Sequence, residues 1–259
     1  MFENSTTTQR NVTKKLSTGH TIYLTTQEDR MLKRVYDYLA GYAQRMVHIQ
    51  KIENKKAEVV KNAGVIAASK GLPSTDSNVI LKSYKHDQRT QLEIQTDAMF
   101  QLKDELQDLE DKFKAFEAQK HTIGFKDIDV VLRKLGAAMH KKNIEFMIWE
   151  VDEQGDGVID WDEFQLTYYR NIVDESGCEP CTFFHVLEFL TFDENNKGYI
   201  IEDDCMEILF ARHGSSKLEK ELQFLFGNQL RAAGGTGTLS LSEYLAATMG
   251  RTGRRAVVP

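Results

Sequence analysis

Apolar residues recur at intervals of three and four positions over much of the first half of the chain. The first such series begins with Leu32, Val35, Leu39, Tyr42, Met46 and Ile49. This spacing is typical of a helix that packs along a coiled-coil seam. Thr25 and Glu28 match a capping box at the start of the series. The pattern therefore predicts one long helix over residues 25–68, about 60 Å in length at a rise of about 1.5 Å per residue.

A second apolar series predicts a coiled-coil helix over residues 84–118. Its eight seam positions, of which seven are apolar, are Leu92, Gln95, Met99, Leu102, Leu106, Leu109, Phe113 and Phe116. Such a stripe needs a partner: the first helix folded back, a second copy of the chain, or another protein. The alternative is a single amphipathic helix that lies on a globular core. Gly71 and Pro73 predict a linker over residues 69–83.

Both ends of the chain are polar. Residues 1–24 are rich in Thr, Asn and Ser and hold few large apolar side chains, which predicts a basic tail without a core of its own. Residues 250–259 form a second, shorter basic tail, whose arginines are Arg251, Arg254 and Arg255.

Carboxylates alternate with other residues over positions 152–163, where the sequence is DEQGDGVIDWDE. A calcium loop of the EF-hand type takes oxygens from its first, third, fifth, seventh, ninth and twelfth residues, the seventh through its backbone carbonyl, and turns on a glycine at the sixth. The predicted ligands are accordingly Asp152, Gln154, Asp156, Val158, Asp160 and Glu163. Gln154 is the one departure, because it lacks a charge, so we expect calcium to bind with weakened affinity. The alternative is an acidic loop that holds no ion.

Three further loops share the aliphatic residue that occupies the eighth position of such a loop. The four eighth residues are Ile123, Ile159, Ile200 and Leu239, at intervals of 36, 41 and 39 residues. Such even spacing predicts two pairs of hands in which eighth residues bridge each other. We therefore expect one lobe over residues 112–170, an insertion over 171–182 and a second lobe over 183–249.

The other loops lack parts of the ligand set. In the loop over residues 193–204, Lys197 replaces the fifth carboxylate and Asp204 replaces the twelfth glutamate. We expect an internal contact between Lys197 and Asp193 to close this loop, which makes calcium binding there doubtful. The loop from Ala232 to Glu243 has no carboxylate at its first, third or fifth position, and we expect it to be free of metal.

The earliest loop is also incomplete. It is one residue short when counted back from Ile123 to Phe116, it ends at Asp127, and His121 occupies the place of the turning glycine. We therefore expect this hand to be structural.

The sequence VLRKLG over 131–136, followed by EFMIWEVDEQGDGVIDWDEF over 145–164, resembles the calmodulin superfamily, and the resemblance covers roughly residues 112–249. It implies an all-α fold of two paired EF-hand lobes, with four mostly degenerate hands and Ca²⁺ as the bound metal, preceded by long coiled-coil-like helices and a polar N-terminal tail. Degenerate hands combined with such helices resemble the EF-hand proteins of ciliary and flagellar axonemes.

That resemblance implies a structural adaptor that docks into a cytoskeletal assembly such as the axoneme, with tubulin or axonemal proteins as partners. The alternative is a soluble calcium sensor that serves as a subunit of a phosphatase, kinase or motor. We find no phosphate loop, serine elbow or paired-histidine motif, so we expect neither an enzyme nor a nucleic-acid partner.

Charge and hydropathy refine these expectations. The net charge is −6, but residues 1–70 hold twelve Lys or Arg and six Asp or Glu, so this segment carries +6 and the remainder −12. A basic segment suits an acidic surface such as that of tubulin, although solvated helix faces would give the same pattern. No apolar run has the length of a membrane span, and no signal peptide is recognisable. We expect a cytoplasmic protein without a membrane partner.

The cysteines leave two smaller alternatives open. Cys178, Cys181 and His185 have a spacing compatible with three zinc ligands, and the first two also have the spacing of a regulatory disulfide.

Overall fold

The computed structural model describes residues 11–70, 81–174, 176, 179, 181–231 and 237–251. The chain divides into two compact units. Met1–Tyr42 and His121–Pro259 make up one unit, hereafter the body, and Ala43–Lys120 makes up the other, hereafter the helical hairpin. No helix within the described ranges combines the length and the apolar character needed to cross a membrane.

The body begins with a β-hairpin. β1 (Asn11–Lys15) pairs antiparallel with β2 (Thr21–Thr25), and Val12 lies opposite Leu24. Leu16, Ile22 and Leu24 are buried. The expectation of a coreless tail over residues 1–24 is therefore wrong for residues 11–24, because the alternation of Ile22 and Leu24 buries one face of β2. Residues 1–10 lie outside the described part.

The predicted helix over residues 25–68 is two helices. The capping box starts α1 (Thr26–Leu39) as expected: the Glu28 N–H donates to Thr25 Oγ1 at 3.1 Å, and the Thr25 N–H donates to Glu28 Oε2 at 2.8 Å. α1 ends where Gly41 adopts a φ of 67°, a left-handed conformation that interrupts a helix and that glycine adopts without strain. α2 (Tyr42–Lys70) then starts anew.

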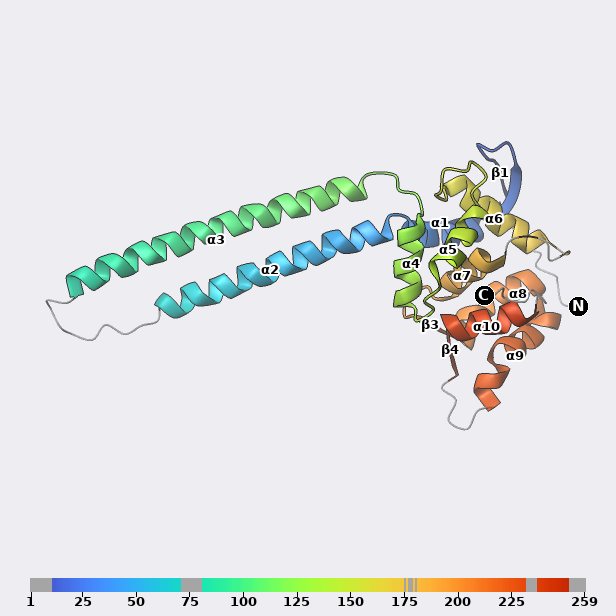
Figure 1. The fold of residues 1–259 in the computed structure, drawn as a ribbon. Helices are drawn as coiled ribbons and strands as arrows, with labels where there is room; N and C mark the ends of the chain where they lie inside the picture. Colours follow the sequence, from blue (N-terminus) through green and yellow to red (C-terminus); the bar gives the residue numbers. More distant parts are fainter. Residues whose placement is uncertain are drawn as a thin grey trace, which may run out of the picture. The chain divides into compact units, whose positions relative to one another are not determined.

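The helices on either side of the four predicted loops follow in the body (Figure 1). They are α4 (Phe125–Lys134), α5 (Lys141–Trp149), α6 (Trp161–Val173), α7 (Cys181–Phe192), α8 (Glu202–His213), α9 (Ser215–Arg231) and α10 (Leu241–Arg251). Two short strands, β3 (Tyr199–Ile201) and β4 (Thr238–Ser240), lie between them.

The predicted pairing of the eighth loop residues is confirmed in both lobes. Ile123 and Ile159 form an antiparallel bridge, with both N–H to carbonyl distances at 2.9 Å. Ile200 lies opposite Leu239 in the β3–β4 ladder. All four side chains are buried, so each pair of loops joins at a shared apolar point.

Helix α1 contributes to the same apolar core as the helices from α4 to α10. Leu32, Val35, Tyr36 and Leu39 are buried in it, and α1 packs against α4, α6 and α7. The aromatic residues of α7 also lie in this core: Phe183, Phe184, Phe189 and Phe192. The N-terminal segment is therefore part of the body and not an appendage to it.

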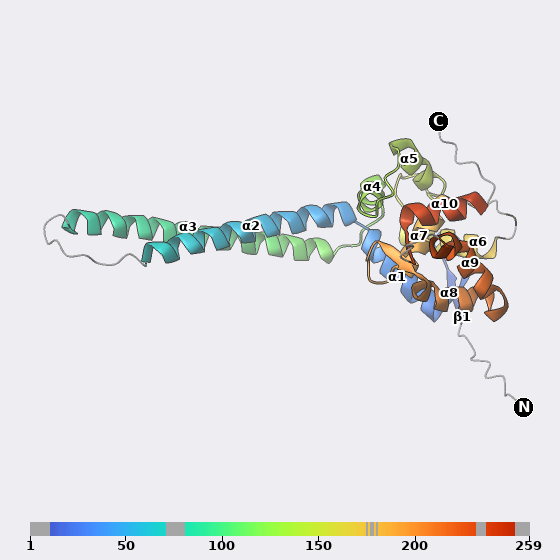
Figure 2. The same cartoon turned by 90° about the horizontal axis from the view of Figure 1, so that it is seen from below.

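The helical hairpin consists of α2 and α3 (Leu81–Glu117), which run antiparallel (Figures 1 and 2). Among the side chains that the structure describes, ion pairs join Arg45 with Glu117, Lys55 with Glu105 and Lys56 with Glu110. The described seam side chains of α3 are half-buried except for the fully buried Phe116, and they are Gln95, Met99, Leu102, Leu106, Leu109, Phe113 and Phe116. The first helix folded back is thus the partner of α3 in this structure.

Several expected segments fall partly or wholly on residues that the structure does not describe. Of the linker predicted over 69–83, residues 71–80 lie outside the described part, while its flanks belong to α2 and α3. Of the C-terminal tail over 250–259, residues 252–259 lie outside it, and so do four positions of the insertion over 171–182.

Candidate metal centre

The loop over residues 152–163 connects α5 to α6, and its first carboxylate is held by the backbone. Asp152 Oδ1 accepts hydrogen bonds from the N–H groups of Gly155 at 2.6 Å and Asp156 at 3.3 Å, and Asp152 Oδ2 accepts one from Gly157 at 2.7 Å. Gly157 has a φ of 82°, as the sharp turn at the sixth position requires. The sequence therefore folds the start of this loop around the carboxylate of its first residue.

Glu163, the twelfth residue, closes the loop from the other end. Its Oε2 accepts from the Asp160 N–H at 3.0 Å, while Asp160 Oδ1 accepts from the Glu163 N–H at 2.9 Å, so the two residues form a capping box for α6. Glu163 Oε1 accepts from the N–H groups of Glu153 at 2.9 Å and Gln154 at 3.1 Å. Glu163 as a residue is 1% exposed, and its carboxylate links the second, third and ninth positions of the loop.

Gln154, the one unusual ligand position, forms a cross-link inside the loop. Its Nε2 donates to Asp160 Oδ2 at 2.8 Å. A glutamine at the third position therefore donates a hydrogen bond to the carboxylate of the ninth position. An aspartate at the third position would instead add one more negative charge to the ligand set. This contact supplies a structural reason for the weakened affinity expected at this loop.

The chemistry of the donors fits calcium. The side chains of Asp152, Asp156, Asp160 and Glu163 and the carbonyl of Val158 supply the hard oxygen ligands that Ca²⁺ prefers. Burial raises the pKa of Glu163 and the nearby Asp160 carboxylate raises it further, while backbone N–H donors act in the opposite direction. A cation at the loop would favour the ionised form of this carboxylate.

The side chains are not yet gathered around one point. Among the residues that the structure describes, no three Asp, Glu, His or Cys side chains are placed to hold a metal ion together. An ion held by both oxygens of Glu163 would replace the hydrogen bonds that Glu163 Oε1 accepts from the Glu153 and Gln154 N–H groups. The loop has the ligands for calcium, and binding would include a rearrangement of its twelfth residue.

The loop over residues 193–204 has the same backbone frame with a different closure. Asp193 Oδ1 accepts from the Lys197 N–H and Oδ2 from the Gly198 N–H, both at 2.7 Å. Lys197 Nζ donates to Asp204 Oδ2 at 2.8 Å and Oδ1 at 3.1 Å, and this hydrogen bond raises the pKa of Lys197. The predicted contact between Lys197 and Asp193 is therefore made by the Lys197 backbone N–H, while the Lys197 ammonium pairs with Asp204 and not with the buried Asp193 carboxylate.

The remaining two loops use their last carboxylates as helix caps. Asp127 Oδ2 accepts from the Gly124 N–H at 2.9 Å, and Glu243 Oε2 accepts from the Ser240 N–H at 2.9 Å. Ala232 and the four residues after it lie outside the described residues. Both carboxylates cap the N-termini of the helices in which they lie, α4 and α10.

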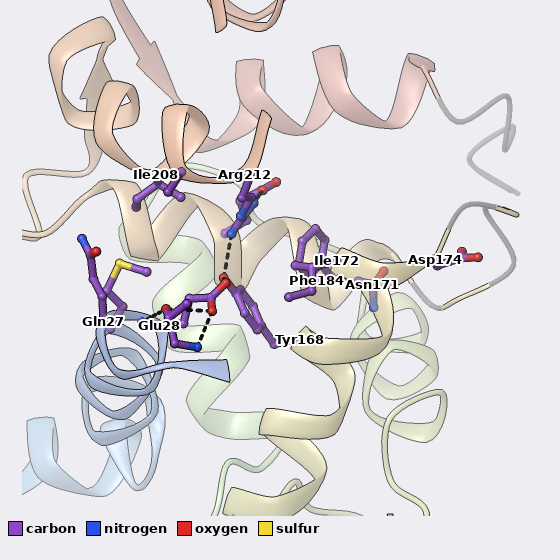
Figure 3. Close-up of a pocket in the computed structure, with 13 residues that line it drawn as sticks. Gln27, Glu28, Tyr168, Asn171, Ile172, Asp174, Phe184, Ile208 and Arg212 are labelled. Carbon is purple, nitrogen blue, oxygen red and sulfur yellow. Dashed lines mark hydrogen bonds and ion pairs between the residues drawn. The ribbon is translucent and has the colours of Figure 1, made fainter. Parts of the chain in front are cut away.

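A buried polar network lies where the two lobes meet α1, and the sequence reasoning missed it (Figure 3). The Arg212 guanidinium of α8 pairs with Glu188 of α7 and donates to the Tyr168 hydroxyl at 3.0 Å. Tyr168 in turn donates to Glu28 Oε1 at 3.3 Å, and Tyr244 donates to Glu188 Oε2. A pocket of about 530 Å³ opens beside these residues between α1, α6, α7 and α8.

The network explains one strongly shifted acid. Burial by itself would raise the pKa of Glu188, but the Arg212 guanidinium, the nearby His185 imidazole and the hydrogen bond from Tyr244 outweigh it and lower the pKa to about 2. The sequence signal for this network was a glutamate, Glu188, within the apolar run FFHVLEFL. Its partner Arg212 could not be recognised from the sequence because it lies 24 residues away. The network joins both lobes to α1.

The cysteine alternatives receive no support from the described side chains. His185 is buried, and its Nδ1 lies 3.8 Å from Glu188 Oε2. Cys178 and the side chain of Cys181 lie outside the described part, and Cys205 is a buried free thiol. Both the zinc site and the disulfide remain sequence predictions.

Comparison with known families decides what kind of loop this is. Residues 119–166, which include the loop over 152–163 and most of the earliest loop, match the family model of the EF-hand domain pair. The chain contains an EF-hand domain pair. Such pairs are Ca²⁺-binding modules, so the EF-hand loop over residues 152–163 implies Ca²⁺ as its cofactor.

Similar proteins support the same conclusion. The chain is 28% identical over 152 residues, 58% of its length and 85% of the relative's, to "Probable calcium-binding protein CML13" of Oryza sativa subsp. japonica. It is 28% identical over 145 residues, 55% of its length and 93% of the relative's, to "Troponin C, isoform 2B" of Homarus americanus. "Troponin C" of Tachypleus tridentatus is also 28% identical over 145 residues, which are 55% of this chain and 92% of that protein. These matches support an EF-hand protein of the calmodulin superfamily.

Proposed function

We propose that this chain is a calcium-binding adaptor without enzymatic activity. One EF-hand loop responds to calcium, and the helical hairpin docks the protein onto a protein partner. The observation that carries the proposal is the contrast between two loops with the same backbone frame. The loop over 152–163 has carboxylates at the first, fifth, ninth and twelfth positions, whereas in the loop over 193–204 the Lys197 ammonium pairs with Asp204.

The surface of the helical hairpin supports a docking role. Val60 is 71% exposed, Ile94 62% and Phe100 60%, which leaves large apolar side chains in water on both helices. The half-buried leucines of α3 keep further apolar surface available to a third helix. Each leucine that a partner buried fully would contribute up to roughly 1.5–3 kcal/mol to binding.

The finer proposal is that the partner belongs to a cytoskeletal assembly such as the ciliary axoneme. The basic segment of residues 1–70, which includes α2, would be attracted to an acidic surface such as that of tubulin. The resemblance to axonemal EF-hand proteins, stated from the sequence, motivates this placement. Under this proposal the hairpin anchors the protein and calcium adjusts the body.

The rival function is a soluble calcium sensor that captures its target when calcium binds. The rearrangement that Glu163 must undergo favours it, because movement at the start of α6 is how such sensors expose apolar surface. Against it, α1 already packs on α4, α6 and α7. Promiscuous calcium sensors bind their targets in grooves lined by flexible methionines. The segment 121–250 has only four methionines, at positions 139, 147, 206 and 249.

Calorimetry of the full-length chain tests the calcium site. We expect one Ca²⁺ per chain and loss of binding in Glu163→Gln, which keeps the side chain's size but removes the charge and one ligand oxygen. Asp129→Asn is the matched control, since it removes a carboxylate of the same lobe that pairs with Arg133 in α4. Two or more tight sites, or undiminished binding in Glu163→Gln, would contradict the assignment.

Cosedimentation with detergent-extracted axonemes tests the anchoring. We expect wild-type protein to stay bound when calcium is chelated, and Ile94→Ser combined with Phe100→Ser to release it. Trp149→Ser, at a 74% exposed aromatic residue of α5, is the control on the body. Release of the wild-type protein by chelation, or retention of the double variant, would favour the sensor.

A further inference from the structure

Residues outside the EF-hand pair contact the calcium loop at positions that supply no ligand. The Ser17 N–H donates to Asp162 Oδ2, at the eleventh loop position, at 2.7 Å. His20 Nε2 lies 3.7 Å from Glu153 Oε2, at the second position. Both Ser17 and His20 belong to the turn between β1 and β2. The β-hairpin therefore touches the loop near both of its ends.

The tenth loop position is held by the same N-terminal segment. The ammonium groups of Lys14 and Lys33 lie 5.7 and 5.4 Å from the centre of the Trp161 ring. The Tyr36 ring packs edge-on against Trp161, with the ring centres 5.1 Å apart. Contacts from β1 and α1 thus meet on the residue that starts α6.

Helix α6 is held further along by α1. Gln165 Nε2 donates to Asp29 Oδ1 at 3.0 Å, and the Tyr168 hydroxyl donates to Glu28 Oε1 at 3.3 Å. Figure 3 shows the Glu28 and Tyr168 side chains next to each other in the lining of the pocket. The first two turns of α6 are therefore tied to α1 as well as to the β-hairpin.

Calcium binding acts on the same part of α6. Glu163 lies in its first turn and must release the Glu153 and Gln154 N–H groups before both of its oxygens can reach an ion. In calcium sensors this step changes the angle between the two helices of a hand. Contacts that hold Glu153, Trp161 and Asp162 in their present places oppose such a movement, and their free energy is subtracted from that of calcium binding.

We propose that residues 11–39 restrain the calcium loop and lower its affinity, with Ser17 as an affinity-determining residue of a loop to which it does not belong. The inference rests on calcium binding by the loop over residues 152–163. Because the coupling of two equilibria is reciprocal, calcium binding in turn loosens the β-hairpin from the body.

Ser17→Pro in the full-length chain tests the restraint. The Gly19 N–H donates to the Leu16 carbonyl at 3.0 Å, so Ser17 is the second residue of a four-residue turn, a position that favours proline. The substitution removes the backbone N–H that donates a hydrogen bond to Asp162, and it changes no charge. We expect the Kd for Ca²⁺, measured by calorimetry, to fall roughly two- to tenfold, the range of one net hydrogen bond.

Ser17→Ala is the matched control because it keeps the N–H and removes only the hydroxyl, so its Kd should equal that of the wild type. A second pair covers the case in which Ser17→Pro does not fold. Lys14→Met removes a cation in contact with Trp161, whereas Lys15→Met removes an exposed cation next to it in the chain. The first should lower the Kd more than the second.

Hydrogen exchange gives an independent readout. We expect amides of residues 11–25 in the wild type to exchange faster with Ca²⁺ than with a chelator. Slower exchange with Ca²⁺, or a Kd of Ser17→Pro equal to or above that of Ser17→Ala, overturns the restraint. A wild-type chain that binds no Ca²⁺ overturns calcium binding itself, and with it the proposed function.

Discussion

Lys197 places its ammonium against both carboxylate oxygens of Asp204, so the fifth and twelfth residues of one EF-hand loop form an ion pair with each other. In a calcium loop the ion would join these two positions. The pair provides a positive charge from within the chain, and the backbone frame around Asp193 is otherwise the one seen around Asp152. The Lys197 ammonium thus links the two positions that a bound ion would otherwise join.

Lys197→Asp combined with Asp204→Glu should create a second calcium site. The double variant restores carboxylates at the fifth and twelfth positions beside Asp193 and Asn195. We expect calorimetry to show a change from one to two Ca²⁺ per chain. Lys197→Met is the control, because it removes the ammonium without adding a ligand and should leave one site. If the double variant stays at one, the ion pair is not what prevents binding.

Gln154→Asp should strengthen the site in the loop over 152–163. The substitution removes the amide that donates to Asp160 and adds a carboxylate at the third position. We expect the Kd for Ca²⁺ to fall on the order of tenfold, because ligand charge sets the affinity of such loops. Gln154→Ala breaks the same contact without adding charge. Equal affinities of the two variants would show that the added charge is not a ligand.

Arg212→Met should destabilise the body strongly. It leaves the Glu188 carboxylate buried without its cation, which costs about 3–5 kcal/mol of unfolding free energy. Adding Glu188→Leu should recover most of that loss, because a well-packed apolar pair replaces a buried ion pair at little cost. Urea unfolding measures both effects. A double variant no more stable than Arg212→Met would contradict this account of the pair.

The free energy of unfolding at acid pH should depend on the protonation of Glu188. Its pKa of about 2 in the folded chain lies below the ordinary 4.5. A depressed carboxyl pKa stabilises the fold above the unfolded-state value, and this contribution is lost as pH falls through the folded-state value. The difference in unfolding free energy between wild type and Glu188→Gln should therefore shrink as pH falls from about 4.5 toward 2. A constant difference would exclude the shift.

Local spacing was sufficient to predict the elements whose determinants lie close together in the chain. The eighth residues identified both loop pairs because each loop requires its aliphatic residue at a fixed offset from its ligands. Ile123 and Ile159 bridge as expected, and so do Ile200 and Leu239. The capping box of α1 was predictable for the same reason, since Thr25 and Glu28 are three residues apart.

Features that depend on tertiary packing were not predictable in this way. The apolar series through Leu39 and Tyr42 keeps its spacing across Gly41, so periodicity alone gave no sign of the break. The Lys197 ammonium has two carboxylates nearby in the loop, those of Asp193 and Asp204. It pairs with Asp204 because Asp193 is buried and its carboxylate accepts backbone N–H groups. The β-hairpin presents only a short alternation, and its turn contacts Asp162, 145 residues further on.

The body is assembled from two stretches of chain that the helical hairpin separates. The Gly41 N–H donates to the Thr122 carbonyl at 3.3 Å, so the chain leaves the body and returns to it at neighbouring points. During synthesis at about 5–20 residues per second, the 78 residues of 43–120 take roughly 4–16 s to emerge. Throughout that delay the buried faces of β2 and α1 have no core to join. A nascent chain of this protein therefore presents Ile22, Leu24 and Leu32 to the surrounding solvent and to chaperones until the EF-hand helices follow.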